Sequence, residues 1–274
     1  MSNIQITENE SGKYSPEWFY NEAQKPEWIA FIRKADTLHE NFINHFGIEH
    51  LKSLSGKELL TSLFYNDKGN KLNLCYVLEM DKDMREIFGS IAGGAAYKFG
   101  LFFHKKTQSW TCGSPAKPVK LTENEAIQKA EEIRNDLVEG AEIISSFGPL
   151  NSTADYEQLY KQLEHISGIN TVWRMKYYQM LFPILFAPFY GQDIQLDVLH
   201  FLNQTPSEIP FIRMGQIALF SKKCNIPGIV FGHIWGRSTN HNNKSNDSET
   251  NTLSDKKHKL HYWMYTVFDD TSWM

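Results

Sequence analysis

The sequence has little cysteine, and its cysteines are far apart. Cys75, Cys112 and Cys224 are the only three in 274 residues, and no two of them form a C-x-x-C pair. Disulfide frameworks and structural zinc sites need closely arranged sets of cysteines. We therefore expect free thiols and a reducing, cytoplasmic location.

Long apolar runs and a leader-like start are also missing. The most apolar window, "MLFPILFAPFY" (180–190), contains two prolines and is far shorter than the roughly 20 residues that a membrane-spanning helix needs. The first residues, "MSNIQITENESGKYSP", are polar and acidic, unlike a secretory signal peptide. These features predict a protein that has no membrane partner.

A complete phosphate-binding loop is absent as well. The stretch "FGSIAGGAAYKFG" (88–100) places Gly89 and Gly94 at the spacing of a Walker A loop, but alanines follow where Lys and Ser/Thr belong. It also precedes a predicted strand, whereas a dinucleotide fingerprint opens a helix. A tight turn, or a close approach of another chain segment, is the favoured interpretation, and we expect no cofactor.

Catalytic signatures are equally scarce. The sequence has no G-x-S-x-G elbow and no H-E-x-x-H pair, so we assign no catalytic residue and no metal ligand. One alternative stays open: a metal-dependent nuclease using Glu79, Asp81 and Asp83, with Lys98 nearby on the next predicted strand. The competing interpretation, a solvated helical turn, is favoured because the E-x-K tripeptide of a common nuclease core is missing.

Helical periodicity dominates what is present. A serine cap and a proline begin a helical region at 15–16 that Gly47 ends, and Thr122 and Glu125 form a capping box before another long helix. Strands are predicted for "LNLCYVLEM" (72–80), "AAYKFGLFF" (95–103) and "WTCG" (110–113), with Pro115 and Pro118 ending the sheet. The fold class is therefore α+β: a helix-dominated domain with a small antiparallel sheet at about residues 72–112. The segment "IPGIVFGHIWG" (226–236) is compatible with a strand or a buried loop.

Composition predicts one main domain with flexible ends. Residues 1–14 form a polar lead, residues 15–237 the domain, with a sub-boundary expected near 115–120, and residues 238–259 a polar, flexible linker. The strongly aromatic segment 260–274 either folds back onto the domain or begins a further module.

Charge distribution is the most informative signal. The formal net charge is only −4, yet three segments contain no acidic residue: 88–121, 165–192 and 209–246. Lys and Arg bind phosphates, and exposed aromatic rings stack on bases or wedge between them. A polarised DNA-binding face is one interpretation. Burial of these segments in the core is the other.

The candidate nucleic-acid-binding residues come from these acid-free segments. The basic ones would hold phosphates and the tryptophan would stack or wedge. They are Lys98, Lys105, Lys106, Trp110, Arg174, Lys176, Arg213, Lys222 and Lys223.

The order of several blocks resembles the N-terminal region of bacterial McrB-like AAA+ ATPases of restriction systems. The blocks are "NLCYVLE", "FGSIAGGAAYKFGLF", "LTENEAIQKAEEIRNDLVEGAEII", "WRMKYYQMLFPILFAPFYG" and "FIRMGQIALFSKK", and the resemblance extends from Trp18 to Trp235. It implies a recognition module for DNA, which in such systems can be modified. It also implies two partners, an AAA+ motor and a McrC-type nuclease.

This sequence departs from the family because it contains no Walker A lysine loop and no motor. The resemblance therefore implies an isolated or split recognition module without nucleotide hydrolysis. The second hypothesis is a protein-interaction module that senses a trigger for a defence complex.

Overall fold

The N-terminal helical region is divided by Pro26. A computed structural model of the chain describes residues 14–64, 72–92, 96–166 and 168–245. Helix α1 (Pro16–Ala23) begins where Ser15 Oγ accepts a hydrogen bond from Trp18 N at 3.2 Å, and α2 (Pro26–Phe46) ends at Gly47 as predicted. Two short helices follow, α3 (Ile48–Ser53) and α4 (Gly56–Leu63).

The predicted strand at 72–80 is wrong, because this segment is helical. Asn73 caps α5 (Leu74–Glu79) by accepting a hydrogen bond from Tyr76 N at 2.8 Å, and Asp81 caps α6 (Lys82–Phe88). All but one of the α5 side chains are buried. A short helix that is buried on nearly all sides has no apolar period, so its sequence looks like a buried strand.

The sheet consequently lies later in the chain than predicted. Residues 96–99 form a 3-10 helix, η1 (Ala96–Phe99), and the antiparallel sheet has the order β1-β2-β3, with β1 (Leu101–His104), β2 (Ser109–Ser114) and β3 (Lys117–Leu121). Pro118 does not end the sheet. It lies in β3, an edge strand, where a missing backbone donor is tolerated. The sheet runs through residues 115–120, where a sub-boundary was expected.

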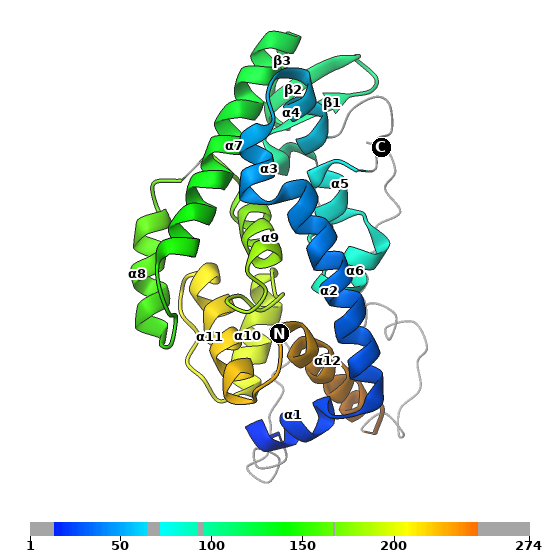
Figure 1. Ribbon diagram of the computed structural model, residues 1–274, viewed down its shortest axis with the longest axis vertical. Coiled ribbons are helices and arrows are strands. Elements are labelled where there is room, and N and C mark those ends of the chain that lie inside the picture. The colour runs from blue at the N-terminus through cyan, green and yellow to red at the C-terminus, as the bar shows by residue number, and fades with distance from the viewer. Residues whose placement is uncertain (1–13, 65–71, 93–95, 167, 246–274) are drawn as a thin grey trace.

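The long helix α7 (Glu123–Ser146) begins with the predicted capping box. Glu125 N donates to Thr122 Oγ1 at 3.3 Å, and Thr122 N donates to Glu125 Oε2 at 2.7 Å. Along its length α7 contacts the sheet, α3 and α4, and then α8 (Thr153–Leu163) and α9 (Thr171–Leu181). The sheet lies at one end of the long axis of the molecule, beside α4 and one end of α7 (Figure 1).

Helix α9 lies at the centre of the molecule. Every residue from Trp173 to Leu181 is buried, and α9 contacts α2, α5 and α7. The remaining helices form the other end of the long axis: α10 (Gln192–Phe201), α11 (Pro210–Lys223) and α12 (Gly228–Ser245) (Figure 1). The α+β fold class, dominated by helices with a small antiparallel sheet, is confirmed.

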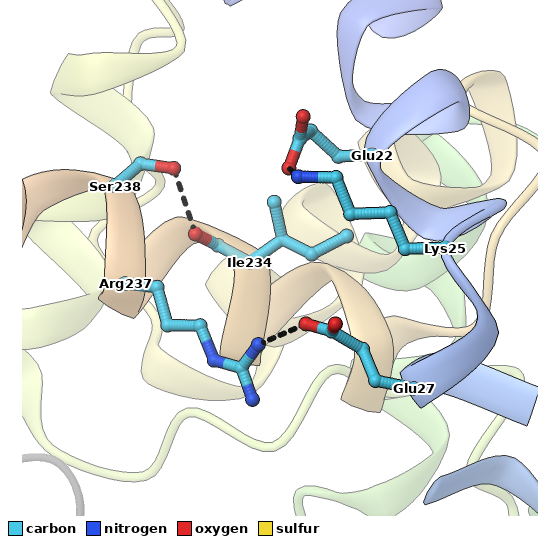
Figure 2. Close-up of polar contacts among 6 residues, drawn as sticks. All are labelled: Glu22, Lys25, Glu27, Ile234, Arg237 and Ser238. Atoms are coloured by element: carbon cyan, nitrogen blue, oxygen red, sulfur yellow. Dashed lines mark hydrogen bonds and ion pairs between the residues drawn. The ribbon is translucent and has the colours of Figure 1, made fainter. Parts of the chain in front are cut away.

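Helix α12 corrects two further expectations. The segment 226–236 is neither strand nor loop, because α12 begins at Gly228 and continues to Ser245, through the first residues of the predicted linker. Arg237 anchors this helix to α2, because its Nη1 lies 2.7 Å from Glu27 Oε1 (Figure 2). Its guanidinium also lies 4.6 Å from the ring centroid of Trp28. The aromatic segment 260–274, the rest of the linker and almost all of the N-terminal lead lie outside the described residues.

The crossing of α7 and α9 provides a test of the packing. A Cβ atom added to Gly140 would lie 1.8 Å from Tyr178 Oη, so Gly140→Ala must displace either the buried Tyr178 ring or the two helices. We expect a loss of about 1–3 kcal/mol in the free energy of unfolding, although alanine favours helix by about 1 kcal/mol over glycine. Urea unfolding measures this, with Gln128→Ala on the exposed side of α7 as control. A Gly140→Ala variant as stable as the wild type would contradict the close crossing.

Candidate nucleic-acid interface

The hairpin formed by β1 and β2 is anchored by its inner face. Leu101 is fully buried, and the rings of Phe103 and Trp110, cross-strand neighbours, meet edge to face at 5.4 Å. Because α7 contacts all three strands, the sheet is fixed to the longest helix of the described chain. A surface on this sheet is therefore presented rigidly.

The hairpin tip is organised by its own polar side chains. His104 Nδ1 accepts a hydrogen bond from Thr107 N at 3.2 Å, and Thr107 Oγ1 lies 2.9 Å from Ser109 Oγ. Gln108 has a left-handed backbone, with φ of 49°, and its Nε2 donates to the Lys105 carbonyl oxygen at 2.7 Å. These bonds define the turn and leave the side chains of Lys105 and Lys106 exposed.

The edge strand β3 adds two further exposed lysines, Lys117 and Lys120. None of the four lysines forms an ion pair with any residue that the structure describes, whereas Lys34, Lys52 and Lys57 each pair with a carboxylate. We call Lys105, Lys106, Lys117 and Lys120 the lysine sheet end. Lys117 and Lys120 lie in the acid-free segment 88–121 but were not among the predicted DNA-binding residues. Their position in "SPAKPVK", just after a predicted turn, was the sequence feature that could have identified them as exposed.

Trp110 is not available for stacking. Only 8% of its surface is exposed, because its ring packs against Phe103 on the α7 side of the sheet. The prediction that it stacks on or wedges between bases is therefore wrong for this conformation. Trp110, near the start of β2, is instead part of the hydrophobic core beneath the sheet.

Lys98 is also withdrawn from the surface. It lies on η1, forms an ion pair with the buried carboxylate of Glu79, and donates to the Ile91 carbonyl oxygen at 3.0 Å. The predicted phosphate contact by Lys98 is therefore corrected to an internal ion pair.

The two arginines are buried and bind backbone carbonyl groups. Arg174 Nη1 donates to Leu163 O at 3.3 Å and also to Ile166 O, just after α8 ends. Arg213 Nη1 donates to Ser207 O at 2.9 Å and to Glu208 O at 3.2 Å. Neither guanidinium can reach a phosphate in this conformation, so their predicted role is wrong here too.

Lys176 is the most deeply buried of the predicted cations. With no exposed surface, its Nζ donates to Phe88 O at 2.6 Å, to Gly89 O at 3.1 Å and to Tyr190 Oη at 3.1 Å. Burial lowers the pKa of Lys176 well below its ordinary value. Its Nζ therefore binds the carbonyl groups at the end of α6 inside the domain and does not contact DNA.

The segment around Gly89 thus presents carbonyl oxygens where a phosphate loop presents amide N–H groups. Phosphate loops point amide N–H groups at an anion, whereas here the carbonyls of Phe88, Gly89 and Ile91 accept hydrogen bonds from two lysines. Gly89 has φ of 74°, and a Cβ there would lie 3.0 Å from Pro188 O. The predicted tight turn and close backbone approach both occur at Gly89.

Lys222 and Lys223 are exposed but lie elsewhere. They end α11, and Lys222 Nζ donates to Asn151 Oδ1 at 2.7 Å. Figure 1 places α11 and the sheet toward opposite ends of the long axis. The structure therefore does not bring these lysines together with the lysine sheet end.

The carboxylates of the nuclease alternative are likewise not gathered. Glu79 pairs with Lys98, Asp81 Oδ1 accepts from Met84 N at 2.9 Å, and Asp83 Oδ1 lies 2.7 Å from Lys34 Nζ. No group of three metal-ligating side chains occurs among the residues that the structure describes.

A groove of about 450 Å³ between α3 and α7 is acidic. Its lining includes Glu49, Glu139 and Glu142. Lys52 pairs with Glu49 and Glu142, and His165 Nε2 lies 2.8 Å from Glu139 Oε1. A groove lined by carboxylates repels phosphates, so it is not part of a DNA interface.

Comparison with known proteins returned no match to any family model, curated protein or solved structure. Within the described residues, no helix combines the length and apolar character required to cross a membrane.

The buried lysine predicts a pH dependence of stability. The pKa of Lys176 is lower in the folded state than its ordinary value of 10.5, so above its folded pKa the unfolded chain binds more protons. Lys176 should therefore contribute a free energy of unfolding that rises with pH. The buried thiols of Cys75 and Cys224, whose pKa values are raised, oppose this rise once thiols of the unfolded chain ionise at about 8.5, so the contribution of Lys176 is the difference in slope between the wild type and Lys176→Met. In Lys176→Met this contribution should disappear.

Urea unfolding at several pH values between about 7 and 9.5 measures the slope. Lys222→Met, at an exposed position, should keep the wild-type slope. Parallel slopes for the wild type and Lys176→Met would show that the folded-state pKa of Lys176 is not lowered.

Proposed function

We propose that this chain is a DNA-binding recognition module and that the lysine sheet end is its DNA contact. The observation that carries the proposal is a set of four exposed lysines on one small sheet, none with a carboxylate partner among the described residues. Unpaired cations on a rigid sheet lose no intramolecular ion pair when they contact phosphates. Their binding releases counterions from DNA, which supplies the affinity.

The system to which the module belongs is part of the same proposal. The block order that resembles McrB-like N-terminal regions supports a role in bacterial restriction or antiphage defence, within the cytoplasm. A separate AAA+ motor and a McrC-type nuclease would act on the DNA that this module holds, modified or not. We assign no nucleotide hydrolysis to this chain.

A second candidate is a protein-binding module that senses a trigger. The observation that favours it is the free edge of β3, on which Val119 is 50% exposed. A partner strand could pair with such an edge. Lysines and proline on an edge strand oppose such pairing, and β3 carries Lys117, Pro118 and Lys120, so DNA is the favoured ligand.

Charge reversal at the hairpin tip tests the proposal. Fluorescence anisotropy with a labelled 20-base-pair duplex, cytosine-methylated or unmethylated, in about 50 mM salt should show binding by the wild type. Lys105→Glu with Lys106→Glu should weaken it by roughly tenfold or more, because two attractive contacts become repulsive.

The matched control is Lys82→Glu with Lys161→Glu, which changes net charge equally at exposed positions on α6 and α8. A third pair, Lys222→Glu with Lys223→Glu, tests the far end. Circular dichroism verifies that each variant is folded. Wild-type protein that binds neither duplex would refute DNA binding, and equal losses in all three pairs would show that net charge alone acts.

A further inference from the structure

The polar groups of the hairpin tip indicate how DNA would be held there. We infer that the lysine sheet end grips the backbone of duplex DNA across a groove and does not read bases. This inference rests on the proposed function, because it specifies the ligand of the same surface.

The side chains that would read base edges are already engaged within the turn. Gln and Asn read adenine and Ser or Thr can bond to several bases, but Gln108 Nε2 is bonded to Lys105 O at 2.7 Å. Thr107 Oγ1 lies 3.1 Å from His104 Nδ1 and 2.9 Å from Ser109 Oγ. Reading a base with these groups would break the bonds that define the turn. The lysine ammonium groups remain available.

The sheet also lacks a stacking platform. Phe102 is 6% exposed and Trp110 8%, and Tyr97, which is partly exposed, meets the Phe102 ring edge to face at 4.8 Å. Proteins that hold single strands stack bases on exposed aromatic rings. Among the described residues of this sheet no strongly exposed ring is present, which favours a duplex over a single strand.

The strand register sets the spacing of the lysines. Lys120 is opposite Thr111 and Lys117 is opposite Ser114, whereas the tip lysines lie just before Ser109. At about 3.4 Å per residue, the Cα atoms of Ser109 and Ser114 are about 17 Å apart along β2. The major groove of B-DNA is about 12 Å wide. The tip and Lys117 can therefore contact phosphates on the two sides of one groove, whereas Lys120, three residues from Lys117 on β3, projects from the opposite face of the sheet.

The number of contacts fixes the expected salt dependence. Three phosphate contacts on a duplex, by Lys105, Lys106 and Lys117, give a slope of log Kobs against log salt of about −2.7, because each contributes about −0.9. Affinity should then fall roughly 40-fold between 50 and 200 mM salt. Neutralising Lys105 and Lys106 should reduce the slope by about 1.8.

The experiment measures anisotropy at four salt concentrations with two duplexes of unrelated sequence and one matching single strand. The protein variants are the wild type, Lys105→Gln with Lys106→Gln, Lys117→Gln with Lys120→Gln, and the control Lys82→Gln with Lys161→Gln. We expect the two duplexes to bind within about threefold of each other and the single strand roughly tenfold more weakly. The tip pair should lose about two thirds of the slope, the pair at Lys117 and Lys120 about one third, and the control pair none.

Failure of the inference differs from failure of the proposed function. Wild-type protein that binds none of the three nucleic acids overturns the proposed function. Binding that prefers one duplex sequence by more than about thirtyfold, and loses this preference in Lys105→Gln with Lys106→Gln, overturns only the backbone inference. Equal or tighter binding of the single strand also overturns the inference alone.

Discussion

The carbonyl groups at the C-terminal end of α6 and just after it are the point on which the rest of the structure depends. Those of Ile87, Phe88, Gly89 and Ile91 all face side-chain donors: His233 Nε2 lies 3.4 Å from Ile87 O, Lys176 binds the next two, and Lys98 binds Ile91. The donors come from α12, α9 and η1. Cations are favoured at a helix C-terminus, where the carbonyls are unpaired. One short segment thus binds side chains of α9 and α12 that lie 87 to 146 residues away in sequence.

Apart from Lys98 and Arg237, which pair with carboxylates, and Lys222 and Lys223 at the end of α11, the basic side chains that the structure describes in the acid-free segments occupy two environments. Lys176, Arg174 and Arg213 satisfy carbonyl oxygens inside the domain, where a carboxylate is not required. The four lysines of the sheet end are in solvent. A sequence without acidic residues is compatible with both environments, because both a core and a polyanion-binding surface exclude carboxylates.

The features that the sequence predicted correctly are those that neighbouring residues in the chain determine. The caps at Ser15 and Thr122 and the stop at Gly47 were predicted because each acts on its nearest neighbours in the chain. Helix α5 was missed because it is buried on nearly all sides, and the strand predicted in its place shifted the sheet prediction toward the N-terminus. The burial of Trp110 and Lys98 depends on contacts with other elements, and the hydrophobic periodicity of a single segment does not predict such contacts. For Arg174 a signal existed: it lies in "TVWRMKYYQMLF", where apolar residues occupy every side of the helix.

The hydrogen bonds around Gly89 limit which new functions this fold can acquire through substitutions. Oxygen atoms line the bend, and the nearby cations belong to the protein itself. A phosphate in their place would meet the negative ends of carbonyl dipoles. Conversion of the bend at residues 87–91 to phosphate binding would require a different backbone path there, because its carbonyl groups are bound from α9, α12 and η1.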